Sequence, residues 1–215
     1  QPMPAAIFSD AIRARAPALE LVEYRSALSD AELADVDVVL GWQMPRGLVE
    51  RLPRLRWVCS VAAGVEKLLV PELAPDVRVS RIVDREQAAG IAQFVVAMAL
   101  RHARELERYE AQQRERAWTR RPLPIARHRV AVLGTGATGG EVAAWLERCG
   151  LVVHGWNRRS AETLHALLAR SDIAVCALPL TPETDGILDA AAFAAMPRGG
   201  YVINVARGAH VVESD

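Results

Sequence analysis

The sequence predicts an α/β protein built from two domains, each with a parallel sheet. Three observations lead to this fold class. Short apolar runs alternate with helix-like stretches along the chain, a proline-containing stretch divides it near the middle, and a glycine-rich turn joins a strand to a helix in the second half. Parallel strands need long crossovers, usually helices, so this alternation favours parallel sheets. A chain of 215 residues, 51% of them hydrophobic, can bury the cores that such domains require.

The first elements are short. We expect a first strand that ends at Phe8 and runs straight into a helix at Ser9–Asp10. Further strands are expected at 35–42, 55–61 and 78–83, with a weaker one at 18–24. Short helices are expected at 29–33, where Ser29 is a suitable N-cap, and at 65–69.

A long helical pattern without proline follows at 85–116. Its first half is apolar on nearly every face, which predicts burial at a domain or subunit interface, whereas its second half is strongly charged and should be solvated. Residues 120–128 carry two prolines and are typical of a linker.

A second α/β region begins at Arg129. Strands are expected at 129–134, 151–156, 172–179 and 201–206, with helices at 139–149 and 161–169.

Charge and cysteine content exclude several classes. The chain has 26 basic and 26 acidic residues, and this zero net charge argues against binding to nucleic acid or an anionic membrane. The longest uncharged stretch, at 88–100, is too short to cross a bilayer, for which about 20 residues are needed. No signal peptide is visible, so we expect a cytoplasmic protein. Cys59, Cys149 and Cys176 are far apart in apolar contexts, which predicts buried free thiols and neither zinc nor disulfides.

A glycine motif of the form GxGxxG occupies 134–139. It follows a strand and opens a helix, the context in which such loops bind the pyrophosphate of a dinucleotide. Its first glycine should permit a tight turn, its second a close backbone approach to the phosphates, and its third close packing of helix on strand. The alternative is a tight turn without a ligand. The expected cofactor-binding residues here are Gly134, Thr135, Gly136, Ala137, Thr138 and Gly139.

The end of the next strand bears on the choice of dinucleotide. Enzymes that use NAD usually place a carboxylate there for the ribose 2′-hydroxyl, but this chain has Asn157 followed by Arg158 and Arg159. Two guanidinium groups can hold a 2′-phosphate, so NADPH is favoured over NADH. The alternative is that both arginines are merely solvated, in a chain with 25 arginines and one lysine.

Four segments carry a family resemblance. They are 52–69 with its AGV turn, the glycine motif at 134–139, ALPLTPETDGIL at 177–188, and 196–215 with its INVARG sequence. Together they resemble the D-isomer-specific 2-hydroxyacid dehydrogenases, in the glyoxylate/hydroxypyruvate reductase branch. The resemblance implies a flavodoxin-like substrate domain at 1–85, a Rossmann domain at 86–215 that is incomplete at its C-terminal end, and an active site in the cleft between them.

The same resemblance assigns roles to residues. Arg207 matches the catalytic arginine, which suits a 2-oxo acid because one guanidinium can hold the carboxylate and polarise the carbonyl. The backbone amides of Ala63 and Gly64 match the groups that bind the substrate carboxylate. Trp42 matches an aromatic position lining the pocket, with an ordinary core tryptophan as the alternative. Further cofactor contacts are expected at Leu178, Pro179, Leu180, Thr184, Val205 and Ala206.

This sequence departs from the family pattern in two places. The family's catalytic glutamate and proton-donating histidine lie downstream of INVARG, and none of the five histidines here occupies such a context. His210 is expected to be an exposed, non-catalytic histidine. A helix also follows Ser160 at once where the family has a longer connection. We therefore expect that the protein has further segments after Ser160 and after Asp215.

The function implied is NADPH-dependent reduction of glyoxylate or hydroxypyruvate to the D-2-hydroxy acid, by a homodimer. An alternative is a non-catalytic dinucleotide sensor or corepressor on the same scaffold. A β-hydroxyacid dehydrogenase is a weaker alternative, because its glycine motif would stand at the extreme N-terminus, whereas about 130 residues precede it here.

Overall fold

A computed structural model describes residues 5–120 and 128–215 of the chain. They divide into two compact units, and each is described by itself. The first comprises Gln1–Val61 and Lys67–Ser80, and the second comprises Ala62–Glu66 and Arg81–Asp215. The proline-containing stretch expected as a linker lies almost wholly outside the described residues.

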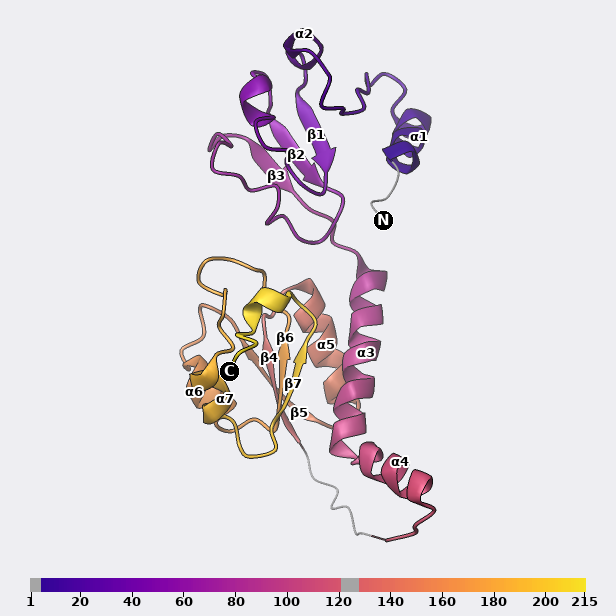
Figure 1. Ribbon diagram of the computed structural model, residues 1–215, viewed down its shortest axis with the longest axis vertical. Helices are drawn as coiled ribbons and strands as arrows, with labels where there is room; N and C mark the ends of the chain where they lie inside the picture. The colour runs from indigo at the N-terminus through magenta and orange to yellow at the C-terminus, as the bar shows by residue number, and fades with distance from the viewer. Residues whose placement is uncertain (1–4, 121–127) are drawn as a thin grey trace. The chain divides into compact units, whose positions relative to one another are not determined.

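The first unit contains a three-stranded parallel sheet in the order β1-β2-β3 (Figure 1). Its strands are β1 (Val38–Gly41), β2 (Trp57–Ser60) and β3 (Arg78–Ser80), and its helices are α1 (Ala5–Arg15), α2 (Asp30–Leu33) and the 3-10 turn η1 (Val49–Arg51). The three strands therefore confirm the expected ones, although each is shorter. The buried core residues are Leu28, Leu33, Met44, Leu48, Leu52, Val58 and Leu68.

The capping of α2 agrees with the sequence. Ser29 Oγ accepts a hydrogen bond from the Glu32 amide, and the Ser29 amide donates to Glu32 Oε2 at 2.7 Å. This reciprocal pair is a capping box, which satisfies amides that the first helical turn would leave unpaired.

Three expected elements of the first unit are absent. Residues 18–24 form no strand, since no described strand pairs with them and Leu19, Val22 and Tyr24 remain exposed. The expected first strand ending at Phe8 is part of α1, whose alanine-rich sequence favours a helix. Residues 65–69 form no helix, and 66–68 are a turn.

The second unit contains a four-stranded parallel sheet in the order β5-β4-β6-β7. The strands are β4 (Arg129–Leu133), β5 (Val152–Trp156), β6 (Ile173–Cys176) and β7 (Tyr201–Asn204), all in the expected places. These two sheets confirm the α/β class with parallel strands.

Helices cover both faces of this second sheet (Figure 1). Helices α3 (Arg85–Ala103) and α5 (Ala137–Arg148) lie on one face, and α6 (Leu164–Leu168) and α7 (Ala190–Ala195) on the other. Side chains alternate along the central strand, so Val130 and Val132 pack toward α3 and α5 while Ala131 and Leu133 pack on the opposite side. This burial on both faces explains why β4 is an uninterrupted apolar run.

The helical pattern at 85–116 is two helices instead of one. Helix α3 ends at Ala103, Glu105 adopts the left-handed conformation with φ 50°, and α4 spans Leu106–Glu115. The charged sequence after Ala103 has no apolar stripe to hold a continuous helix against the sheet.

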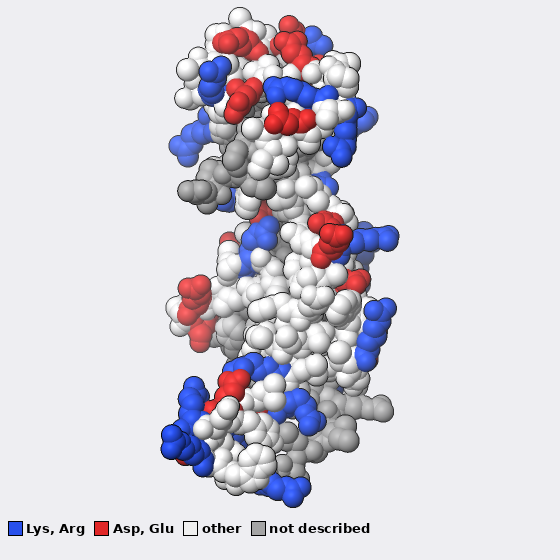
Figure 2. Space-filling model, turned by 90° about the vertical axis from the view of Figure 1, so that its right-hand side faces the viewer, with Lys and Arg blue, Asp and Glu red and all other residues white. Residues whose placement is uncertain are grey.

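A smaller part of the α3 surface is buried than the apolar sequence of its first half predicts. Ala88, Ala92, Val95 and Ala99 are buried against the core, but Phe94 is 54% exposed. Figure 2 shows few charged side chains over this part of the surface. Among the residues that the structure describes, only one stripe of α3 is therefore covered.

The three cysteines are free thiols in different surroundings. Cys176 is buried and Cys59 half-buried, but Cys149 is exposed, so the expectation of burial was wrong for Cys149. It follows the last turn of α5, where the chain turns at the surface. No helix in the described part of the chain is long and apolar enough to cross a membrane.

Candidate active site at the glycine loop and Arg207

The glycine motif joins β4 to α5 in a closely packed turn. Gly134 has φ +97°, its amide donates to the Trp156 carbonyl at 2.8 Å, and a Cβ there would lie 2.6 Å from the Ala177 carbonyl oxygen. A Cβ on Gly139 would overlap the Gly134 carbonyl oxygen. These contacts explain why the turn and the start of the helix require glycine at both positions.

The start of α5 faces open space. Gly136 is its N-cap, with no side-chain hydrogen bond to the helix, and a Cβ there would meet nothing within 4 Å. Thr135, Gly136 and Ala137 are exposed and Thr138 is half-buried. The first turn of a helix presents unpaired amides and a partial positive charge, which together suit a phosphate group.

The residues after β5 lie beside this loop. Asn157 Nδ2 donates to Thr135 Oγ1 at 3.0 Å, and Asn157 Oδ1 accepts from the Arg159 amide at 2.8 Å. Arg158 and Arg159 are exposed, and neither guanidinium forms an ion pair within the described residues. Two cationic groups near the helix start can therefore accept an anionic ligand.

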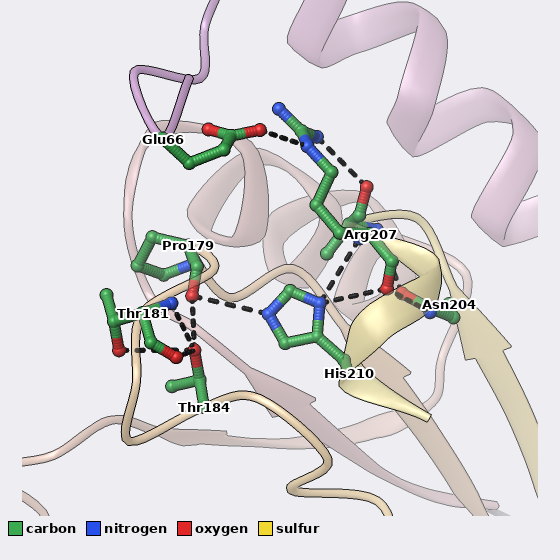
Figure 3. A network of polar contacts seen from close by, with 8 residues as sticks. Glu66, Pro179, Thr181, Thr184, Asn204, Arg207 and His210 are labelled. Atoms are coloured by element: carbon green, nitrogen blue, oxygen red, sulfur yellow. Dashed lines mark hydrogen bonds and ion pairs between the residues drawn. The ribbon is translucent and has the colours of Figure 1, made fainter. Parts of the chain in front are cut away.

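The loop after β6 is closed by a threonine hydroxyl. Thr184 Oγ1 donates to the Pro179 carbonyl at 2.7 Å and accepts from the Thr181 amide at 2.9 Å (Figure 3). Leu178 is buried, whereas Pro179 is exposed and Leu180 half-buried. Arg158 helps to lower the pKa of the neighbouring Glu183, after a larger effect of a hydrogen bond from Thr181.

Backbone hydrogen bonds hold the segment that carries Arg207. Asn204, the last residue of β7, donates from Nδ2 to the Arg207 carbonyl at 2.8 Å and accepts from the Ala206 amide at 3.0 Å. The Val205 amide donates to the Cys176 carbonyl at 3.0 Å. The asparagine therefore orders the turn from which the arginine side chain projects.

The structure brings Arg207 together with the AGV turn. A Cβ on Gly64 would overlap both Arg207 Nη2 and Glu66 Oε2, so a side chain there would displace the ends of these two side chains. Glu66, two residues further on, accepts from Arg207 Nε at 2.6 Å. Burial favours the neutral carboxyl, but a backbone hydrogen bond and Arg207 outweigh it, so the pKa of Glu66 is lowered. Residues 62–66 and Arg207 all belong to the second unit.

Sequence reasoning missed Glu66. Its partner is 141 positions away, and no local pattern marks such an ion pair. The only available signal was its place two residues after the glycine of the AGV turn.

His210 is completely buried, so the expectation of an exposed histidine was wrong. It ends the 3-10 turn η2 (Gly208–His210), which folds the ring inward. Nδ1 lies 3.2 Å from the Arg207 amide, and Nε2 lies 3.3 Å from the Pro179 carbonyl (Figure 3). Nδ1 also lies 2.9 Å from the Arg207 carbonyl oxygen. The tautomer protonated at Nε2 accepts from the Arg207 amide and donates to the Pro179 carbonyl, whereas the tautomer protonated at Nδ1 donates to the Arg207 carbonyl. The ring therefore ties η2 to the loop after β6.

Trp42 follows β1 in the first unit and is 59% exposed. This exposure excludes the alternative of a core tryptophan. In the described residues, no group of three or more His, Cys, Asp or Glu side chains is arranged to hold a metal ion.

A family comparison agrees with this geometry. Residues 96–215 match the family described as the NAD binding domain of the D-isomer specific 2-hydroxyacid dehydrogenases. The chain belongs to this family. The resemblance found in the sequence is thereby confirmed, and the matched segment contains the glycine loop, both arginines after β5, and Arg207.

Curated members of the family are similar over most of this chain. The glyoxylate/hydroxypyruvate reductase A of Yersinia enterocolitica is 30% identical over 224 residues, covering 95% of this chain and 70% of that protein. That of Serratia proteamaculans is 32% identical, covering 83% of this chain. The chain spans only 63% of the Serratia protein's length.

Solved structures of the family show the same fold. A D-isomer specific 2-hydroxyacid dehydrogenase from Xanthobacter autotrophicus, in complex with NADPH and MES, has a TM-score of 0.84 at 35% identity, covering 98% of this chain and 71% of that one. An NADPH-dependent glyoxylate/hydroxypyruvate reductase from Sinorhizobium meliloti, in complex with NADP and sulfate, has a TM-score of 0.76 at 34% identity, covering 89% and 66%.

Proposed function

We propose that this protein reduces a small 2-oxo acid, glyoxylate or hydroxypyruvate, to the D-2-hydroxy acid with NADPH. The approach of the Arg207 guanidinium to the turn at Gly64 carries this proposal. A 2-oxo acid presents a carboxylate next to a carbonyl, and a guanidinium beside backbone amides can bind the first and polarise the second. The names of the Yersinia and Sinorhizobium relatives support the substrate class.

The residues of the glycine loop fit a dinucleotide. The open space over Gly136 leaves room for a pyrophosphate at the start of α5. Arg158 and Arg159 would hold the 2′-phosphate that distinguishes NADPH from NADH, and the NADPH and NADP complexes of the relatives support this choice. When bound, NADPH would supply the hydride to the oxo carbon and leave as NADP⁺, while the oxo oxygen takes up a proton to give the hydroxyl.

Each residue near the nicotinamide then has a defined task. Arg207 binds the substrate carboxylate and polarises the oxo group, with the amides of Ala63 and Gly64 as additional donors. The loop at 178–184 would support the cofactor, and Val205 and Ala206 would contact its nicotinamide. His210 has no part in proton donation, because it is buried and its ring nitrogens are engaged.

We also propose the domain roles of 1–85 for substrate and 86–215 for the dinucleotide, with Trp42 lining the substrate pocket. Residues 62–66 belong with the second unit in the structure, so the boundary in space differs from that in sequence. A homodimer would cover the exposed side of α3 around Phe94.

The cofactor assignment is tested by replacing both Arg158 and Arg159 with alanine. Binding of NADPH and NADH is followed by nicotinamide fluorescence. Loss of a charge-assisted phosphate contact should weaken NADPH binding by about tenfold to a hundredfold and leave NADH nearly unchanged. Arg148→Ala, an exposed arginine at the other end of α5, is the matched control. An equal loss for both cofactors would contradict the assignment.

The substrate assignment is tested with a panel of 2-oxo acids, measured as loss of NADPH absorbance. Glyoxylate and hydroxypyruvate should be the best substrates, and Arg207→Ala should abolish turnover without weakening NADPH binding. Turnover that survives the loss of Arg207 would refute its role.

A further inference from the structure

We propose that Glu66 is a positioning residue that orients the Arg207 guanidinium toward the turn at Ala63–Gly64. This inference rests on the proposed function, because it concerns how the substrate-binding arginine is held. The alternative is that the ion pair has a purely structural role and holds the AGV turn against the rest of the unit.

Two nitrogens of the Arg207 guanidinium donate hydrogen bonds within the protein, and the third lies beside the turn at Gly64 together with the Glu66 carboxylate. Arg207 Nε donates to Glu66 Oε1 at 2.6 Å, and Nη1 donates to the Ala206 carbonyl at 3.0 Å (Figure 3). The group is planar and its N–H bonds form a rigid fork, so two anchors on two sides determine its orientation. Nη2 is then the nitrogen closest to Gly64.

A carboxylate suits this task better than a neutral acceptor alone. The side chain of Arg207 is 45% exposed, and a long arginine with that much freedom would sample many rotamers. An ionised acceptor forms the stronger, charge-assisted hydrogen bond. Glu66 is 27% exposed and its pKa is lowered, so it is ionised at neutral pH.

The charge of Glu66 does not itself attract the substrate. A 2-oxo acid is an anion, and a second carboxylate beside the arginine opposes its binding. If Glu66 contributes to turnover, it must do so through the orientation of Arg207. Orientation and charge can be separated, because glutamine keeps the Oε1 acceptor and loses the charge, whereas alanine loses both.

The first experiment observes the arginine directly in the full chain without substrate. In a 1H–15N NMR spectrum, the Nε–H signal of Arg207 is assigned by its loss in Arg207→Lys. In the wild type and in Glu66→Gln, we expect the chemical shift of this signal to differ from the shifts of solvent-exposed arginines. In Glu66→Ala, we expect the signal to move to the shifts of the solvent-exposed arginines. A wild-type signal among the solvated arginines, or one that Glu66→Ala leaves in place, would overturn the proposal.

The second experiment is steady-state kinetics with glyoxylate and NADPH. Glu66→Ala should raise KM for glyoxylate by about tenfold or more, because the guanidinium is no longer aimed at the carboxylate. Glu66→Gln should stay within about threefold of wild type, and both variants should bind NADPH normally. Glu72→Ala, an exposed glutamate six positions further along, is the matched control.

The outcomes are separable. Equal kinetic defects in Glu66→Gln and Glu66→Ala, with the wild-type Nε–H signal retained in Glu66→Gln, would show that the charge acts on turnover by a route other than orientation and would overturn the proposal. A lower melting temperature and weaker NADPH binding in Glu66→Ala, with an unchanged KM for glyoxylate, would show that Glu66 only stabilises the fold and would overturn the proposal. If the wild type turns over neither glyoxylate nor hydroxypyruvate, the proposed function fails, and the NMR signal still decides whether Glu66 orients Arg207.

Discussion

Replacing Gly139 by alanine tests the packing of α5 on the sheet. The added Cβ would overlap the Gly134 carbonyl oxygen and lie 2.9 Å from the Gly134 carbonyl carbon. Both obstacles are backbone atoms of the glycine turn, which no change of rotamer can remove. The helix must therefore move away from β4, or the turn must deform.

The size of the effect follows from these distances. A separation of 2.9 Å is about half an ångström short of ordinary contact at 3.4 Å, and the overlap with the oxygen requires a larger movement. Such a shift also loosens Val142 and Leu146, which are completely buried on the inner face of α5. Overpacking of a core costs about 1–3 kcal/mol, and a backbone obstacle belongs at the upper end. At 2–4 °C per kcal/mol, the melting temperature should fall by about 6–12 °C.

The assay is thermal unfolding followed by circular dichroism, with the adjacent glycine as control. Gly140 also lies in α5, but a Cβ there would meet nothing within 4 Å. Gly140→Ala should stabilise the protein by about 0.5–1 kcal/mol, because alanine loses less entropy in a helix. Opposite shifts in the two variants are expected. A melting temperature of Gly139→Ala within about 2 °C of wild type would refute the packing argument.

Three further predictions concern binding, pH and assembly. Gly136→Ala should leave the melting temperature nearly unchanged but weaken NADPH binding by about tenfold, because the added Cβ would lie where the pyrophosphate approaches. An NADPH affinity equal to that of the wild type would show that the cofactor binds elsewhere. The pKa of His102 is lowered from 6.5 by burial and then by His128, so its proton binds more readily in the unfolded chain. Stability should therefore fall as the pH drops through about 6.5, and His102→Gln should flatten this slope in melting curves recorded between pH 8 and pH 5. Phe94→Arg should shift the mass measured by analytical ultracentrifugation from dimer to monomer, and an unchanged mass would place the interface elsewhere.

The second unit could be predicted well from the sequence because its signals are local. The run at 129–133 is apolar because it is buried on both faces, and the glycines at 134 and 139 meet steric requirements within a few residues of themselves. Such constraints are visible in consecutive residues, so β4, the glycine turn and α5 were predicted in the right place.

Predictions failed where distant contacts decide the structure. The sequence at 18–24 has the pattern of a strand, but a strand also needs a neighbouring strand to pair with, and the pattern does not show whether one exists. None of the described strands pairs with these residues. Nothing local distinguishes a buried histidine from an exposed one, so His210 was misplaced. Glu66 was overlooked for the same reason, because its partner Arg207 is distant in the sequence. Gly64 and Arg207 were already candidate site residues.

The burial of His210 gives the site a mechanical property. One imidazole contacts the backbone of Arg207 through Nδ1 and the carbonyl of Pro179 through Nε2, in a place that water does not reach. Moving either partner alone leaves a buried polar group unpaired, which costs about 1–3 kcal/mol. The loop at Pro179, which we propose supports the dinucleotide, and the backbone of Arg207, the proposed substrate-binding residue, are therefore coupled through His210. A ligand that moves the loop is expected to shift the arginine as well.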